Sequence, residues 1–135
     1  MSLEALGREV EQAYVKNQRV LAFDTYYQMA LAAPTFHARS AAQYLRDLFD
    51  HYGTRQVDTP RGKVTRFQLF DVPFDGGRDP LVGHEEVQQR VYRAISNFVR
   101  DGRVNRLLLL HGPNGSAKST FVACLQRAME HYATL

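Results

Sequence analysis

The sequence of 135 residues has a single cysteine, Cys124, and no tryptophan. One thiol cannot form an internal disulfide, and so little cysteine is typical of a reducing compartment, so a cytoplasmic location is expected. The opening MSLEALGREVEQ lacks the basic and apolar regions of a signal peptide, and no apolar run is long enough to span a membrane. These absences exclude an internal disulfide framework and predict a chain without a membrane-spanning helix.

An excess of one charge is also missing, because 17 Lys and Arg stand against 14 Asp and Glu. The basic residues are scattered, and the densest group falls in a predicted hairpin: Arg55, Arg61, Lys63 and Arg66. Neither a recognition helix nor an aromatic-rich set of strands accompanies them. A solvated hairpin is therefore expected, and nucleic acid is not an expected partner.

The first half of the chain has helical periodicity. Apolar residues recur on one face over residues 3–14, and Asp24 is placed to cap a short helix that Pro34 closes. A third apolar stripe runs through residues 36–53, where Gly53 is placed as the stop. The sequence therefore predicts a helical region over residues 1–54.

The middle of the chain changes character. Residues 55–71 contain two β-prone runs around a Thr-Pro-Arg-Gly turn, which predicts a hairpin. Residues 71–80, with two prolines and a Gly-Gly pair, predict a linker between modules. An amphipathic helix is then expected over residues 83–102, with two glutamates in its first turn and Gly102 at its end.

The segment RLLLLHG, residues 106–112, is apolar without alternation, as expected for a parallel strand covered on both faces. It enters GPNGSAKS and continues into a helical stripe over residues 120–132, which is the context of a phosphate-binding loop. Backbone N–H groups would bind phosphate, Lys118 would reach the β- and γ-phosphates of ATP, and the Ser119 hydroxyl would bind Mg²⁺. The candidate nucleotide-binding residues of this loop are Gly112, Pro113, Asn114, Gly115, Ser116, Ala117, Lys118, Ser119 and Thr120.

Ala117 departs from the pattern, which has glycine at this position. Alanine keeps the N–H group that binds phosphate but adds a Cβ atom. If the position requires a positive φ, the strain is on the order of 1–2 kcal/mol. We expect this alanine to weaken binding rather than to abolish it.

An acidic strand that would hold Mg²⁺ and polarise water does not follow the loop. The segment FQLFD, residues 67–71, has an acidic end but precedes the loop, so it is not expected to take this part. The leucine strand would also lack parallel neighbours. We therefore expect the chain to be the amino-terminal piece of a longer protein and to have no catalytic activity alone.

The order of these elements, with DPLVGHEEVQQRVYRAISNF before the strand and loop, resembles the start of an AAA+ ATPase module. More narrowly, it is similar to the amino-terminal region of PrkA-type serine protein kinases. The resemblance covers residues 79–132 best and implies that Leu81, Val82 and Gly83 lie beside the adenine. It further implies ATP and Mg²⁺ as cofactors, with a protein substrate and a homo-oligomer as partners of the complete kinase or ATPase.

The expected fold is therefore α/β, with a helical region over 1–54, a hairpin and linker over 55–80, and the beginning of a P-loop domain over 81–135. Two other interpretations stay open. The loop GPNGSAKST also resembles that of ABC transporter ATPases, although the helix before the strand is unlike that family. The chain could instead be a non-catalytic regulatory module with a vestigial loop.

Overall fold

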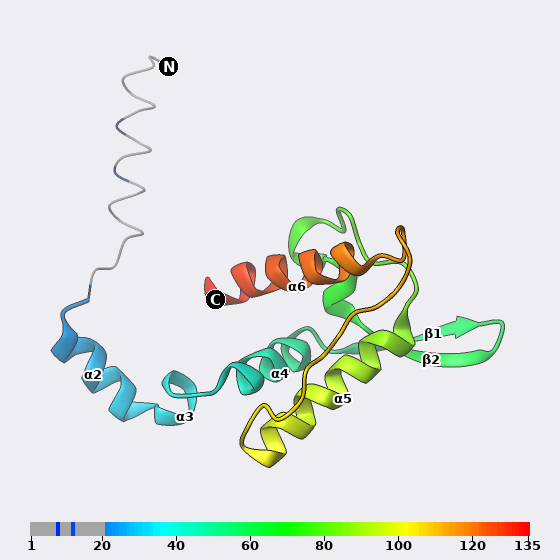
Figure 1. Cartoon of the computed structure of the whole chain (residues 1–135). Coiled ribbons are helices and arrows are strands. Elements are labelled where there is room, and N and C mark those ends of the chain that lie inside the picture. The colour runs from blue at the N-terminus through cyan, green and yellow to red at the C-terminus, as the bar shows by residue number, and fades with distance from the viewer. Residues whose placement is uncertain (1–7, 9–11, 13–20) are drawn as a thin grey trace. The chain divides into compact units, whose positions relative to one another are not determined.

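The computed structural model describes residues 8, 12 and 21–135, and divides the chain into two compact units, 1–39 and 40–135 (Figure 1). The helix predicted over residues 3–14 lies outside the described residues, except for Arg8 and Gln12, which are helical. The second unit runs through the expected domain boundaries at residues 54/55 and 80/81.

The first unit contains the helices α2 (Phe23–Ala32) and α3 (Pro34–His37). The prediction that Asp24 caps the first of them is wrong, because the cap position is Ala22 and Asp24 lies in the first turn. A carboxylate there still stabilises the helix through its dipole. Pro34 is the first residue of α3, where its missing N–H group costs nothing.

The second unit begins with α4 (Ala41–Tyr52). The Ser40 hydroxyl caps it by accepting a hydrogen bond from the Gln43 N–H at 3.2 Å. Gly53 ends it with a φ of 71°, a conformation that favours glycine. The predicted helix is thus confirmed from residue 41 onward, and it buries Leu48 and Phe49 completely.

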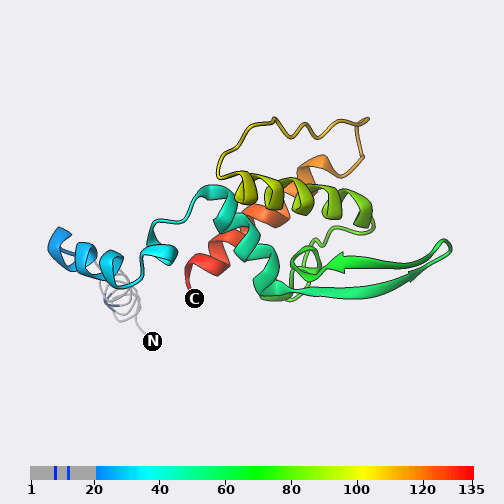
Figure 2. The same ribbon diagram turned by 90° about the horizontal axis from the view of Figure 1, so that it is seen from below.

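The predicted hairpin is formed by β1 (Thr54–Thr59) and β2 (Gly62–Phe67), which pair antiparallel with Val57 opposite Val64. The second strand is shorter than predicted, because a 3₁₀ helix, η1 (Gln68–Asp71), follows Phe67 directly. Leu69 and Phe70 of η1 are completely buried. The hairpin projects from the helices, whereas η1 returns the chain to the core (Figure 2).

The segment predicted as a linker is packed into the second unit. Val72 is completely buried, and the short 3₁₀ helix η2 (Pro73–Asp75) follows it. Arg127 pairs with the Asp75 carboxylate and donates a hydrogen bond to the Arg78 carbonyl at 2.9 Å. These contacts join the segment to the helix that carries Arg127.

Two longer helices complete the unit, α5 (Glu85–Asp101) and α6 (Lys118–Ala133), and Gly102 ends α5 with a φ of 69° as predicted. Their apolar faces meet α4 and η1 in one core, in which the Phe70 and Phe121 rings lie 4.8 Å apart. The completely or almost completely buried apolar residues of this core are Leu48, Phe49, Phe67, Leu69, Phe70, Val72, Leu81, Ile95, Phe121, Cys124 and Ala128.

The leucine segment does not form the predicted parallel strand. Figures 1 and 2 show it as an extended trace that runs back along α5 towards α6. Leu107 and Leu109 are 87% and 77% exposed, whereas Leu110 packs against the core. The described part of the chain contains one sheet, the two-stranded antiparallel hairpin, so its fold is mixed helix and strand without a parallel sheet. None of the described helices is long and apolar enough to cross a membrane.

A candidate phosphate-binding loop beside a cavity

The candidate loop connects the leucine segment to the first residue of α6, Lys118. It turns through Gly115, with a φ of 79°, and Ala117, with a φ of 61°. The Ser116 N–H donates to the Pro113 carbonyl at 3.2 Å and closes the turn. Since Ala117 lies in the left-handed region, the condition for strain is met, and we expect a cost of about 1–2 kcal/mol.

Gly112 is required by a close approach within the loop. A Cβ atom at this position would lie 2.7 Å from the Ser116 Oγ and 3.3 Å from its Cβ. Both atoms belong to the Ser116 side chain, so a residue with a Cβ atom here would force the Ser116 hydroxyl to rotate away from its present position. The first glycine of the motif therefore has a steric reason in this chain.

Lys118 folds its side chain back over the loop. The Nζ atom donates hydrogen bonds to the Gly112 carbonyl at 2.5 Å, the Pro113 carbonyl at 2.8 Å and the Ser116 Oγ at 3.0 Å. All three acceptors are uncharged. An anion at the loop would therefore be a stronger partner for the ammonium group than the oxygens that hold it.

The start of α6 adds a positive potential at the same place. Ala117 occupies the cap position, where its side chain has no acceptor, and the first turn contains no acidic residue. The helix has 16 residues, and its first N–H groups point towards the loop. Ser119, which is exposed, and Thr120 lie in this first turn.

A cavity of about 430 Å³ opens beside the loop. This volume is within the range of small-molecule sites. Its wall comes from the loop, from the segment before α5, from one face of α5, from the leucine segment and from α6. The lining residues are Leu81, His84, Val87, Arg90, Val91, Leu108, Leu109, Leu110, His111, Gly112, Pro113, Ser116, Ala117, Lys118 and Phe121.

The resemblance implies that Leu81, Val82 and Gly83 lie beside the adenine, but only the first of these lines the cavity. Leu81 is buried and lines the cavity. His84 also lines it and occupies the N-cap position of α5 with a φ of 59°, without a capping hydrogen bond from its side chain. Val82 is 81% exposed, and neither it nor Gly83 belongs to the lining. In the loop, Asn114, Gly115, Ser119 and Thr120 also lie outside the lining.

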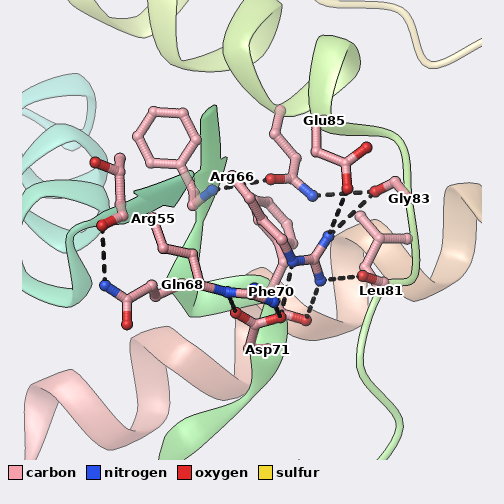
Figure 3. Close-up of polar contacts among 11 residues, drawn as sticks. Arg55, Arg66, Gln68, Phe70, Asp71, Leu81, Gly83 and Glu85 are labelled. Atoms are coloured by element: carbon pink, nitrogen blue, oxygen red, sulfur yellow. Dashed lines mark hydrogen bonds and ion pairs between the residues drawn. The ribbon is translucent and has the colours of Figure 1, made fainter. Parts of the chain in front are cut away.

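The Arg66 side chain holds this segment through the Leu81 and Gly83 carbonyls, which lie beside its guanidinium in Figure 3. The side chain was expected to be solvated with the other basic residues of the hairpin, and this prediction is wrong, because Arg66 is 4% exposed. Its Nε donates to the Asp71 carboxylate at 2.7 Å, and its terminal nitrogens donate to the Leu81 and Gly83 carbonyls, the latter at 3.3 Å. It also pairs with Glu85 at 3.4 Å. A buried guanidinium requires such partners.

Asp71 accepts from two arginines at once. Arg55 donates to it at 2.8 and 3.1 Å from the exposed side, opposite the bond from Arg66. Burial raises the pKa of the Asp71 carboxyl, but the hydrogen bonds and charges of Arg55 and Arg66 outweigh it and hold that pKa below its ordinary value. The carboxylate is therefore ionised wherever the protein is near neutral pH.

The sequence pattern predicts part of the surroundings of several residues that line the cavity. Val87, Val91 and Phe121 belong to apolar stripes that were predicted as core faces, and they line the cavity as well. Nothing in the sequence distinguishes Arg90 as a cavity residue, since exposed arginines are common on helices. Among the described residues that line the cavity there is no carboxylate, and no group of three His, Cys, Asp or Glu gathers there that could hold a metal.

The residues present fit the phosphates of a nucleotide better than a metal alone. The loop supplies a cation and unpaired N–H groups, and Ser119 supplies one hydroxyl, so Mg²⁺ would depend on ligand phosphates for most of its oxygen ligands. Comparisons of the chain with protein families, with curated proteins and with solved structures find no match in any of the three.

Proposed function

We propose that this chain binds Mg-ATP, with the phosphates at residues 112–119 and the base towards Leu81 and His84. The observation that carries the proposal is the single cavity lined both by Lys118 of the loop and by the segment before α5. A ligand that is anionic at one end and flat and largely apolar at the other matches these two kinds of wall.

At the phosphate end, Lys118 would exchange three neutral acceptors for phosphate oxygens. The N–H groups of the loop and of the first turn of α6 would bind further oxygens, since Ala117 leaves them without a side-chain cap. The Ser119 hydroxyl would be the one protein ligand of Mg²⁺. The ion would neutralise part of the phosphate charge there.

At the base end, the wall is mainly apolar. Leu81 is buried, Val87 and Val91 come from α5, and Phe121 comes from α6. Burial of a purine against such side chains contributes through the apolar area removed from water. The His84 ring stands at the same wall and offers one polar contact.

The wider proposal is that the chain is the ATP-binding part of a PrkA-like protein with an AAA+ module. The succession of the amphipathic helix α5, an extended apolar segment, a glycine-containing loop and α6 supports it. Because no carboxylate lines the described cavity, the proposal for this chain is limited to binding. Turnover, a protein substrate and a homo-oligomer are proposed only for a PrkA-like protein that would contain it.

A second candidate is a regulatory module with a vestigial loop. It is favoured by Lys118 itself, whose ammonium group is already held by three oxygens of its own loop. The strain at Ala117 points the same way. The two candidates differ in whether anions displace the loop carbonyls from Lys118.

Titration of the chain with Mg-ATP separates them. Lys118→Ala should raise the Kd of ATP about 30- to 150-fold, because a charge-assisted contact contributes about 2–3 kcal/mol. Lys63→Ala is the matched control, since Lys63 is an exposed lysine of the hairpin, and its Kd should equal that of the parent. Equal binding by the parent and Lys118→Ala would contradict the proposal and favour the regulatory module.

A further inference from the structure

Arg66 makes contacts that reach well beyond its own hairpin. Its guanidinium donates to the carbonyls of Phe70, Leu81 and Gly83 and to the carboxylates of Asp71 and Glu85. Figure 3 shows these acceptors arranged around the head group, on η1, on the segment before α5 and on the first turn of α5. One side chain of β2 thus joins three parts of the second unit.

Gln88 of α5 holds the same segment from the other side. It is completely buried, and its Nε2 donates to the Gly83 carbonyl at 3.3 Å. Its Oε1 accepts from the Phe67 N–H at 3.1 Å, next to Arg66 in β2. The Gly83 carbonyl therefore accepts from two buried side chains that are themselves fixed.

The segment needs such support because its backbone is strained. Gly83 adopts its φ of 73° without strain, whereas His84 has a φ of 59°, which is strained for a residue other than glycine. Conformations of this kind persist only where the surroundings determine them. The Leu81 N–H adds one backbone bond, to the Phe70 carbonyl at 2.9 Å.

Stability alone does not account for a buried arginine here. Replacing a buried ion pair by apolar side chains of similar volume is often neutral or stabilising. What the guanidinium supplies is a fixed backbone between Leu81 and Glu85. Two residues of that stretch, Leu81 and His84, line the cavity beside the loop.

We propose that Arg66, supported by Gln88, is a positioning residue that holds Leu81 and His84 as the base-binding wall of the cavity. It thereby makes the cavity selective for a nucleoside triphosphate over a bare polyphosphate. The proposal rests on the proposed function. Arg66 does not line the cavity and acts only through the backbone carbonyls that it holds.

Two titrations test it, one with Mg-ATP and one with inorganic tripolyphosphate. Arg66→Lys keeps the charge, but an ammonium group cannot span the separate acceptors. It should raise the Kd of ATP about tenfold, because fewer molecules have the wall in place. The Kd of tripolyphosphate, which needs only the loop, should stay within about twofold of the parent value.

Arg55→Lys is the matched control. Arg55 shares the Asp71 carboxylate with Arg66, and the hydrogen bonds that Figure 3 draws from Arg55 run to Asp71 alone. Both Kd values should stay at the parent level in this variant. Since a general loss of folding would weaken both ligands together, the ratio of the two Kd values isolates the positioning role.

Gln88→Met decides the question should Arg66→Lys fail to fold, because it removes only two hydrogen bonds. The same selective loss of ATP binding is expected. An unchanged ratio of the two Kd values in the folded variant would overturn the inference while leaving the proposed function in place. A parent that binds neither ligand would overturn both.

Discussion

Residues 81–84 and residues 107–110 of the second unit both lie outside helices and strands. They differ in the hydrogen-bond partners that are available to their backbone groups. Between residues 81 and 84, two carbonyls accept from the buried side chains of Arg66 and Gln88. Residues 107–110 are four leucines, and their side chains cannot form hydrogen bonds with the backbone around them. Both stretches line the same cavity, one as a fixed wall and the other with Leu107 and Leu109 largely in solvent.

The difference shows what each stretch requires from the rest of the fold. Polar side chains can hold an irregular backbone from one side, provided that they are buried and paired. An apolar extended segment needs a neighbouring strand for its N–H and C=O groups and a second layer for its exposed face.

The largest effect is expected when a leucine of the buried core is compared with a leucine of the extended segment. Leu69 of η1 is completely buried, whereas Leu109 is mostly exposed. Leu69→Ala should lower the free energy of unfolding by about 2–5 kcal/mol, because it removes buried area and leaves a cavity. Leu109→Ala should change it by less than about 0.5 kcal/mol. Urea unfolding of both variants measures the difference, and a similar loss at Leu109 would mean that its segment is covered in solution.

A smaller effect is expected at the loop. Ala117→Gly relieves left-handed strain of about 1–2 kcal/mol, but glycine also gives the unfolded chain more conformational entropy, which costs about 0.5–1 kcal/mol. The free energy of unfolding should therefore rise by up to about 1.5 kcal/mol. Ala123→Gly, on the exposed face of α6, should lower it by about 1 kcal/mol. If thermal unfolding shows a gain in the free energy of unfolding for Ala117→Gly and a loss for Ala123→Gly, the left-handed conformation of Ala117 is supported. A loss at both positions would contradict it.

The ion pairs of Asp71 with Arg55 and Arg66 should make the free energy of unfolding depend on pH. Since the folded pKa of Asp71 lies below its ordinary value, its contribution is present above that ordinary value and is lost as the pH falls through the folded pKa. Asp71→Asn should flatten the decline in the free energy of unfolding below about pH 4. Chemical unfolding across this range is the measurement. An unchanged acid decline in Asp71→Asn would show that the carboxylate is not held by its arginines.

The smallest effect concerns Cys124, whose thiol is completely buried in α6. Burial raises its pKa, so little thiolate is present at neutral pH. The native chain should therefore react with a thiol reagent more slowly than the urea-unfolded chain. Equal rates followed by absorbance would mean that α6 does not pack as described.

The sequence predicted the regular elements of the second unit well, and the reason is local. Gly53, the turn at residues 59–62 and Gly102 mark element ends through backbone preferences that need no tertiary contact. The phosphate-loop pattern likewise located the turn through Gly115 and its helix. The positive φ of Ala117 was anticipated as a condition, which the structure meets.

The remaining features depend on contacts between distant residues. Nothing in the local sequence distinguishes buried Arg66 from exposed Arg61 on the same hairpin, because only the approach of Asp71 and Leu81 buries one of them. The prolines and glycines after Asp71 predict a linker, but the burial of Val72 makes this segment part of the core. The leucine run predicted a parallel strand, but a strand also requires a neighbour, and the described residues offer it none.

The proposed function requires one ligand to contact both the loop and the segment at residues 81–84. Amide chemical shifts of the isotope-labelled chain, recorded first with Mg-ATP and then with tripolyphosphate, measure this. Mg-ATP should shift the amide signals of residues 112–119 together with those of Leu81 and His84, whereas tripolyphosphate should shift those of the loop alone. Shifts confined to the hairpin, or the absence of shifts at residues 112–119 with either ligand, would contradict the proposed function.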